Sequence, residues 1–311
     1  MKAVTHLAEG RFKYKQAFDM VEDDTGGILD VPQVGQYRTQ EPVPAHAFEE
    51  ERIKALSRDT PTGFIPLDLS NVLGTGFAAT TPLLLCRYLV LRPNERFSHE
   101  LNATGQIVYV LRGKGESTSG GICFQWSAGD VFVFPWGSPV EHCASSDALL
   151  FMATDEPALA FVNASPSSPA PVLPAHFKHA RIDERLQSIR EKTEQHQAAG
   201  KFVTFYTKPM KALRSMLPAM NCSINTLEAG GNQRPHRHNA VAVTLSIQGE
   251  GVYSKVSGER VDWTEFGAFV TPPTVIHSHH NGGSKEMWSF VIQDSGFHSY
   301  CRTPGFAFST D

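Results

Sequence analysis

The stretch WTEFGAFVTP at residues 263–272 has a near copy, WSAGDVFVFP, at residues 126–135. In both copies a tryptophan opens the stretch and a proline closes it. A second pair, VLRGKG at 110–115 and SIQGEG at 246–251, lies just before the first. The two pairs are offset by 136 and 137 residues, so one single-residue gap relates them. A repeat of this length predicts a duplicated domain.

The chain around these repeats reads as β-structure. Short apolar runs such as PLLLCRYLVL, QIVYVLRGKG and ALLFMAT are separated by glycine and proline, which is typical of a barrel or sandwich. Each repeat unit consists of short hairpin-forming segments, which favours a jelly-roll barrel. Helices are expected only near HAFEEERIKALS and in the 179–201 segment, where Ile182, Leu186 and Ile189 share one face.

These patterns divide the chain into four parts. Residues 1–65 form a polar, proline-rich N-terminal extension, and residues 66–162 form the first β-domain. Residues 163–201 combine a Ser/Pro/Ala-rich linker with the expected helix, and residues 202–311 form the second β-domain.

Composition narrows the class of protein. The chain has 311 residues, 41% of them hydrophobic, and a net charge of −4, which gives no reason to expect nucleic acid or an anionic membrane as partner. No apolar run is long enough to span a membrane, and the N-terminus lacks the apolar core of a secretory signal. The five cysteines have no CxxC spacing and suit reduced thiols. A cytoplasmic location is therefore expected.

Five of the thirteen histidines lie in two short windows, RPHRHNAVAV (234–243) and TVIHSHHNGG (274–283). Alternation along a strand would point His236 and His238 to the same face. His277, at the end of the next strand pair, would complete one face of a metal's coordination sphere. Neutral imidazoles suit iron, zinc, copper and nickel alike, so the residues predict a metal site without choosing the metal.

The two windows resemble the motifs of the cupin superfamily, whose fold is a double-stranded β-helix or jelly-roll barrel. In the first motif Gly230, His236, His238 and Gly249 match. Pro272, His277 and Asn281 match the second motif. The glutamate ligand that cupins usually carry is replaced by Ala242.

A three-histidine bicupin resembles gentisate 1,2-dioxygenase and its salicylate-cleaving relatives. The resemblance implies a ferrous ion held by His236, His238 and His277, with an aromatic hydroxy acid chelating the iron beside dioxygen, and cleavage of the aromatic ring. His279 matches a further family histidine, for which we expect a role beside the metal or in moving a substrate proton. His280 has no assigned role.

Thr244 departs from the family pattern, because it occupies the place of the arginine expected to bind the substrate carboxylate. We count it, with His279, as a candidate catalytic residue. A hydroxyl cannot replace a two-pronged cation, so Arg87, Arg96 and Arg234 are alternative carboxylate partners, beside the metal alone. Apolar walls around the ring are expected from Val243, Leu245, Val270, Trp288 and Phe290.

The first β-domain is expected to be metal-free. Aligning the repeats places Glu100, Asn102 and Val140 at the three ligand positions, with His99 one residue out of register. Two other functions stay open: another metal-dependent cupin enzyme, such as a diketone dioxygenase or a lyase, and a non-catalytic small-molecule-binding cupin. Exposed strand edges favour a homo-oligomer, either a dimer or a tetramer.

Overall fold

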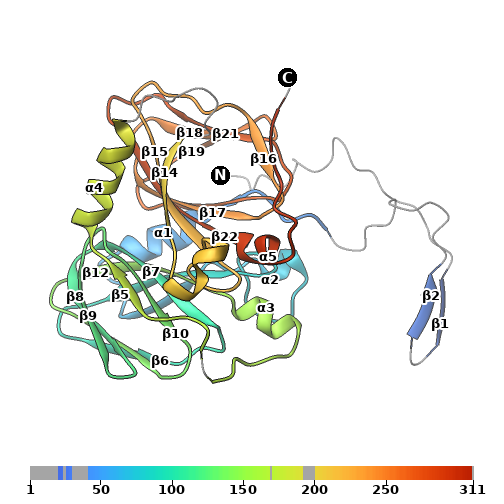
Figure 1. Ribbon diagram of the computed structural model, residues 1–311, viewed down its shortest axis with the longest axis horizontal. Coiled ribbons are helices and arrows are strands. Elements are labelled where there is room, and N and C mark those ends of the chain that lie inside the picture. The colour runs from blue at the N-terminus through green and yellow to red at the C-terminus, as the bar shows by residue number, and fades with distance from the viewer. Residues whose placement is uncertain (1–19, 24–25, 30–40, 169, 192–199, 310–311) are drawn as a thin grey trace.

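The computed structural model describes residues 20–23, 26–29, 41–168, 170–191 and 200–309. Over these residues the chain folds into two β-barrels, one above the other in Figure 1, each made of two opposed sheets. The expected all-β class with few helices is confirmed. Much of the predicted N-terminal extension, residues 1–19 and 30–40, lies outside the described residues.

The first barrel opposes a six-stranded and a four-stranded sheet. The six-stranded sheet has the order β13 (Ala175–Phe177), β10 (Val131–Pro135), β7 (Gly105–Arg112), β12 (Ala148–Thr154), β5 (Leu85–Leu91) and β4 (Gly63–Pro66). The four-stranded sheet has the order β6 (Arg96–His99), β11 (Val140–Ala144), β8 (Lys114–Ser119) and β9 (Ile122–Ser127). Large apolar side chains, among them Trp126, Phe132 and Phe134, fill much of the space between the two sheets.

The second barrel opposes a six-stranded and a five-stranded sheet. The six-stranded sheet has the order β14 (Lys201–Phe205), β15 (Asn221–Leu227), β22 (Met287–Gln293), β17 (Ala242–Gln248), β20 (Ala268–Thr271) and β3 (His46–Ala47). The five-stranded sheet has the order β19 (Glu259–Asp262), β18 (Val252–Val256), β21 (His277–Asn281), β16 (His236–His238) and β23 (Phe306–Phe308). The predicted extension thus supplies an edge strand to each barrel, β3 to the second and most of β4 to the first.

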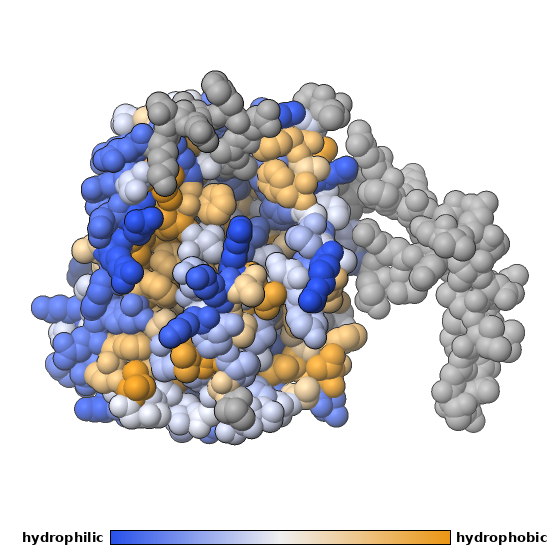
Figure 2. Space-filling model, viewed as in Figure 1, coloured by the Kyte–Doolittle hydropathy of each residue, from blue (hydrophilic) through white to orange (hydrophobic). Residues whose placement is uncertain are grey.

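The remaining elements are peripheral. They are the hairpin β1 (Met20–Asp23) and β2 (Gly26–Leu29), the 3₁₀ helix η1 (Lys208–Leu213), and helices α1 (Glu49–Leu56), α2 (Ser70–Leu73), α3 (Glu156–Phe161), α4 (His179–Arg190) and α5 (Ser295–Tyr300). Both predicted helices form, as α1 and α4. Ile182 and Leu186, one turn apart on α4, are buried, and the side of the molecule occupied by α4 is strongly hydrophilic (Figure 2). No helix among the described residues is long and apolar enough to cross a membrane.

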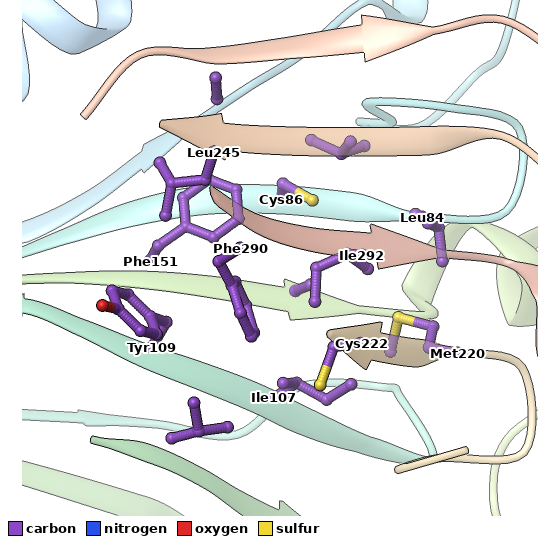
Figure 3. Packing of buried hydrophobic residues seen from close by; sticks show 14 of the residues in the cluster. Leu84, Cys86, Ile107, Tyr109, Phe151, Met220, Cys222, Leu245, Phe290 and Ile292 are labelled. Carbon is purple, nitrogen blue, oxygen red and sulfur yellow. The ribbon is translucent and has the colours of Figure 1, made fainter. Parts of the chain in front are cut away.

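The two barrels share one apolar core, formed where their six-stranded sheets face each other (Figure 3). The rings of Tyr109 and Phe290 stack across this core with centroids 5.0 Å apart. Leu245 and Ile292 also belong to it, and every second residue of β17 and β22 points the same way. The barrels are therefore held together by burial of apolar surface, the main stabilising term in folding.

This core corrects one expectation from the sequence. Val243, Leu245, Val270 and Phe290 were expected to line a ring-binding pocket, but they are buried in the core between the barrels, and Trp288 packs against it. Because side chains alternate along a strand, Ala242, Thr244 and Ser246 point to the opposite face of β17, into the second barrel.

The internal repeat is confirmed by a shared irregularity of the strands. In the first barrel, the pairing of β12 with β7 shifts register between Leu149 and Leu150. In the second barrel, the pairing of β22 with β17 shifts between Ser246 and Gln248. The residues skipped by these bulges, Leu111 and Ile247, occupy the same place in the two repeats. Bulges are kept as features of a fold, so this match supports duplication of one domain.

Candidate metal centre

Three histidines from two neighbouring strands meet inside the second barrel. His236 and His238 lie on β16, and His277 on β21 is the register partner of His236. Each histidine has one ring nitrogen within 4.8 Å of a ring nitrogen of each of the other two. Among the described residues, this is the group of three side chains that could hold a metal ion. The ring centroid of His277 is 4.4 Å from that of His236 and 4.7 Å from that of His238. The predicted meeting of these three side chains is present.

Each of these rings is oriented by a backbone carbonyl. Nδ1 of His236 lies 3.0 Å from the carbonyl oxygen of Arg234, Nδ1 of His238 lies 2.7 Å from that of Ala240, and Nδ1 of His277 lies 2.9 Å from that of Val275. A carbonyl only accepts, so each Nδ1 carries the hydrogen and each Nε2 keeps a lone pair. Metal-binding histidines usually show this tautomer, in which a hydrogen bond from one ring nitrogen leaves the other nitrogen available to the metal.

The electrostatics of the cluster also suit a metal. Burial lowers the pKa of His236 and of His238. Burial, together with the neighbouring histidines, holds the pKa of His277 far below its ordinary value. All three rings are therefore neutral near pH 7, which ligation requires. A divalent ion such as Fe(II) fits this donor set, which lacks a carboxylate because Ala242 stands where a glutamate would lie.

His279 is held by a chain of buried hydrogen bonds. The indole Nε1 of Trp263 donates to Ser254 Oγ at 2.8 Å, and this oxygen lies 2.7 Å from Nδ1 of His279. Burial and the neighbouring histidines lower the pKa of His279 to about 3, so the ring is neutral. The two partners of Ser254 Oγ are the indole N–H, which can only donate, and Nδ1 of His279, so the hydroxyl hydrogen goes to Nδ1 and the hydrogen of His279 lies on Nε2. His279 is thus prepared to donate a hydrogen bond.

His280 points to the other face of β21. Its Nδ1 lies 2.6 Å from Oδ1 of Asn232, its Nε2 lies 2.8 Å from Ser278 Oγ, and its ring stacks on Tyr253. His280 is therefore engaged on the face of β21 opposite to the three-histidine cluster.

The face of the six-stranded sheet that looks into the second barrel carries uncharged polar side chains beside apolar ones such as Phe269 and Met287. By alternation with the core residues, this face carries Asn221 on β15, Gln293 on β22, Ala242 and Ser246 on β17, and Thr271 on β20. Among the described residues, Oδ1 of Asn221, Oγ of Ser246 and Oγ1 of Thr271 are buried without a hydrogen-bond partner. Buried polar atoms of this kind call for a ligand or water.

Thr244 lies on the same face, 1% exposed, between Ala242 and Ser246. The three arginines considered as its substitutes are engaged elsewhere. Arg87 pairs with Glu156 at 2.6 Å in the first barrel, and Arg96 pairs with Glu141 on the surface of that barrel. The exposed guanidinium of Arg234 lies over the ring of Phe308. The structure therefore brings none of the three candidate arginines to the histidine cluster.

The first barrel keeps part of the same arrangement. Trp126 Nε1 donates to Ser117 Oγ at 2.8 Å, and this oxygen lies 2.6 Å from Nδ1 of the buried His142. His142 is thus the counterpart of His279. The tryptophan, the serine and the histidine each recur at an offset of 137 residues. This spacing is visible in the sequence, but the sequence analysis did not assign a role to either serine.

His99 corrects the alignment of the repeats. It is the register partner of Val140 just as His236 is the partner of His277, so His99 takes the place of His236 and is not out of register. Nε2 of His99 lies 2.7 Å from Oε1 of Gln106. His99 therefore differs from His236, whose Nδ1 faces a backbone carbonyl and whose Nε2 keeps its lone pair. Val140 stands where the third ligand would lie. That the first barrel holds no metal stays a prediction.

Comparisons with known proteins agree with this geometry. The sequence model of the cupin domain matches residues 223–292, which span both histidine windows. The chain is 36% identical over 101 residues to 5-aminosalicylate 1,2-dioxygenase from Comamonas sp, covering 32% of this chain and 26% of that protein. It is 41% identical over 69 residues to a gentisate 1,2-dioxygenase from Aquipseudomonas alcaligenes, covering 22% of this chain and 20% of that protein. The matched segments therefore span about a quarter or less of each relative.

The likeness in fold extends much further than the likeness in sequence. The structure superposes on salicylate 1,2-dioxygenase from Pseudaminobacter salicylatoxidans with a TM-score of 0.73, covering 90% of this chain and 91% of that one at 14% identity. Both barrels are thus included in the match. Residues 223–292 match the cupin domain, and the chain as a whole has the two-barrel fold of salicylate 1,2-dioxygenase.

Proposed function

We propose that this protein is a ring-cleaving dioxygenase that acts on a hydroxylated aromatic acid of the gentisate and salicylate type. The observation that carries the proposal is the three-histidine cluster, in which every ring presents a lone pair on Nε2 because a carbonyl holds Nδ1. The relatives named above are dioxygenases of 5-aminosalicylate and gentisate. Salicylate 1,2-dioxygenase, which shares the fold, has been crystallised as an adduct with gentisate.

His236, His238 and His277 would hold the metal. Ferrous iron bound there would supply the electron transfer between aromatic ring and dioxygen that ring cleavage needs. Three histidine ligands would leave the ion able to bind further ligands from the barrel interior. Thr244 faces that interior. Together with the uncharged polar residues around it, Thr244 would orient the polar groups of the substrate.

His279 would act on the substrate rather than on the metal. Its hydrogen is held on Nε2 by the serine and tryptophan behind it, and its pKa is too low for a permanent charge near pH 7. A neutral donor of this kind stabilises negative charge that develops on an oxygen without competing for the metal. We assign His279 this role.

Oxygen uptake tests the proposal. The protein is reconstituted with Fe(II) under anaerobic conditions and mixed with gentisate, 5-aminosalicylate, salicylate or 1-hydroxy-2-naphthoate. We expect uptake of one dioxygen per product with at least one of them, and incorporation of both atoms of ¹⁸O₂ into an open-chain product. A His236→Ala variant should show neither. Iron-loaded protein that consumes no oxygen with any of these acids would refute the assignment.

One observation favours a second candidate. The face of the six-stranded sheet that looks into the second barrel carries hydroxyls and amides. Among the residues named on this face, there is no cation that could bind a carboxylate. A diketone chelates a metal through two oxygens without needing such a cation, so a diketone dioxygenase fits the lining as well. Adding pentane-2,4-dione to the same panel separates the two, because uptake with the diketone and with no aromatic acid would select the second candidate.

A further inference from the structure

We propose that Gln293 is the fourth protein ligand of the metal, through its amide oxygen Oε1. This inference rests on the proposed metal centre but is independent of the reaction that the centre carries out. It assigns a ligand to the position that Ala242 leaves without one.

The strand pairing places Gln293 beside this gap. Gln293 is the last residue of β22, and its register partner on β17 is Ala242. Partners in adjacent strands have their side chains side by side on one face, about 5 Å apart. The methyl group of Ala242 leaves room there, and the longer Gln293 side chain crosses the barrel interior toward β16 on the opposite sheet.

The amide of Gln293 reaches a proposed ligand atom. Its Nε2 lies 3.4 Å from Nε2 of His238. That nitrogen carries the lone pair of the ring, because the hydrogen of His238 is on Nδ1, which faces the carbonyl of Ala240 at 2.7 Å. Two adjacent ligands of one divalent ion, each about 2.1 Å from it, are about 3 Å apart. The separation from Gln293 to His238 is close to that of two neighbouring ligand atoms.

The oxygen of the amide, rather than its nitrogen, would face a cation. The two ends of a carboxamide have nearly the same shape, and a half turn about the last side-chain torsion exchanges them. The NH₂ group can donate only to the lone pair of His238. Once that lone pair is committed to a cation, the positive end of the amide is repelled and Oε1 is attracted.

A neutral oxygen ligand has a consequence for the substrate. A glutamate at Ala242 would cancel part of the metal's charge, whereas Gln293 leaves all of it. The full charge would attract a carboxylate that finds no arginine at Thr244. Amide oxygens also bind divalent ions more weakly than carboxylates, so a chelating substrate would displace Gln293 readily.

Metal binding by the full-length protein tests the inference without any turnover. The apo-protein is titrated with Mn(II) by calorimetry, and the visible spectrum of its Co(II) form is recorded. We expect Gln293→Leu to weaken Mn(II) binding by about tenfold or more and to change the Co(II) spectrum. Gln293→Glu should tighten Mn(II) binding by about tenfold, a gain that misfolding cannot produce. The matched control Ser289→Ala, four residues earlier on the same face of β22, should stay within about twofold of the parent.

The outcomes separate this inference from the proposed function. Binding that is lost in His236→Ala but lies within twofold of the parent in both Gln293 variants would overturn the ligand role and leave the three-histidine centre intact. Failure of the parent protein to bind any divalent ion would overturn both. Oxygen uptake that is absent while the Gln293 variants behave as expected would refute only the reaction.

Discussion

Replacement of Ser254 should distinguish an effect on function from an effect on stability, because Ser117 in the first barrel provides a matched control within the same chain. Ser254 and Ser117 occupy the same place in the two barrels, and both are 0% exposed. Each accepts a hydrogen bond from a tryptophan at 2.8 Å and lies 2.6–2.7 Å from a histidine Nδ1. Replacement of either serine by alanine therefore removes the same two buried hydrogen bonds.

The expected loss of stability follows from these contacts. Each variant leaves one indole N–H and one imidazole nitrogen without a partner in a buried place, at about 1 to 3 kcal/mol for each group. We expect both Ser254→Ala and Ser117→Ala to lower the free energy of unfolding by about 2 to 6 kcal/mol, and the two melting temperatures to fall by amounts similar to each other. Differential scanning calorimetry of the two variants under one set of conditions measures this.

The expected loss of function differs between them. Without Ser254 nothing holds the hydrogen of His279 on Nε2, so we expect turnover of the iron-loaded enzyme to fall by about tenfold or more. Ser117→Ala should leave turnover within about twofold at a temperature where both variants are folded. Equal losses of turnover in the two variants would show that the serine acts only through the stability of the barrel, and the role assigned to His279 would be wrong.

Three further predictions concern the metal, the shared core and pH. Elemental analysis should find no bound iron in His236→Ala, whereas His99→Ala and His142→Ala retain about the parent amount; equal losses would contradict the single-site arrangement. Phe290→Ala removes a ring that stacks on Tyr109 between the barrels and should cost about 3 to 5 kcal/mol in urea unfolding, and a cost below about 1 kcal/mol would mean that the barrels are held together by other contacts. Burial opposes ionisation of Asp130, but hydrogen bonds from His176, Lys178 and two backbone N–H groups outweigh it and lower its pKa to about 2. A lowered pKa stabilises the fold above the unfolded value near 4, so the cost of Asp130→Asn should be about 2 kcal/mol at pH 7 and about half of that at pH 3, and a cost that grows as pH falls would contradict the sign.

Much of the candidate centre was predictable because it is local. The HRH and HSH triplets place alternate histidines on one face of a strand whatever the strand pairs with. Helix α4 was predictable for the same reason, since Ile182 and Leu186 lie one turn apart. The tryptophan, serine and histidine relay was present in the repeat, but its serines are ordinary polar residues until two partners are seen to meet them.

Sequence alone determined that the chain is a duplicated all-β protein and that His236 and His238 share one face of a strand, because strand periodicity and motif spacing are properties of short segments. Tertiary structure decided which face of each strand lines the interior of its barrel. Val243 and Leu245 belong to the core between the barrels and Thr244 faces the interior of the second barrel, because only the packing of one six-stranded sheet on the other chooses a face. It also decided the partners. His99 lies opposite Val140, and Gln293 lies beside Ala242 within reach of His238, because strand register depends on pairing between residues about forty to fifty positions apart.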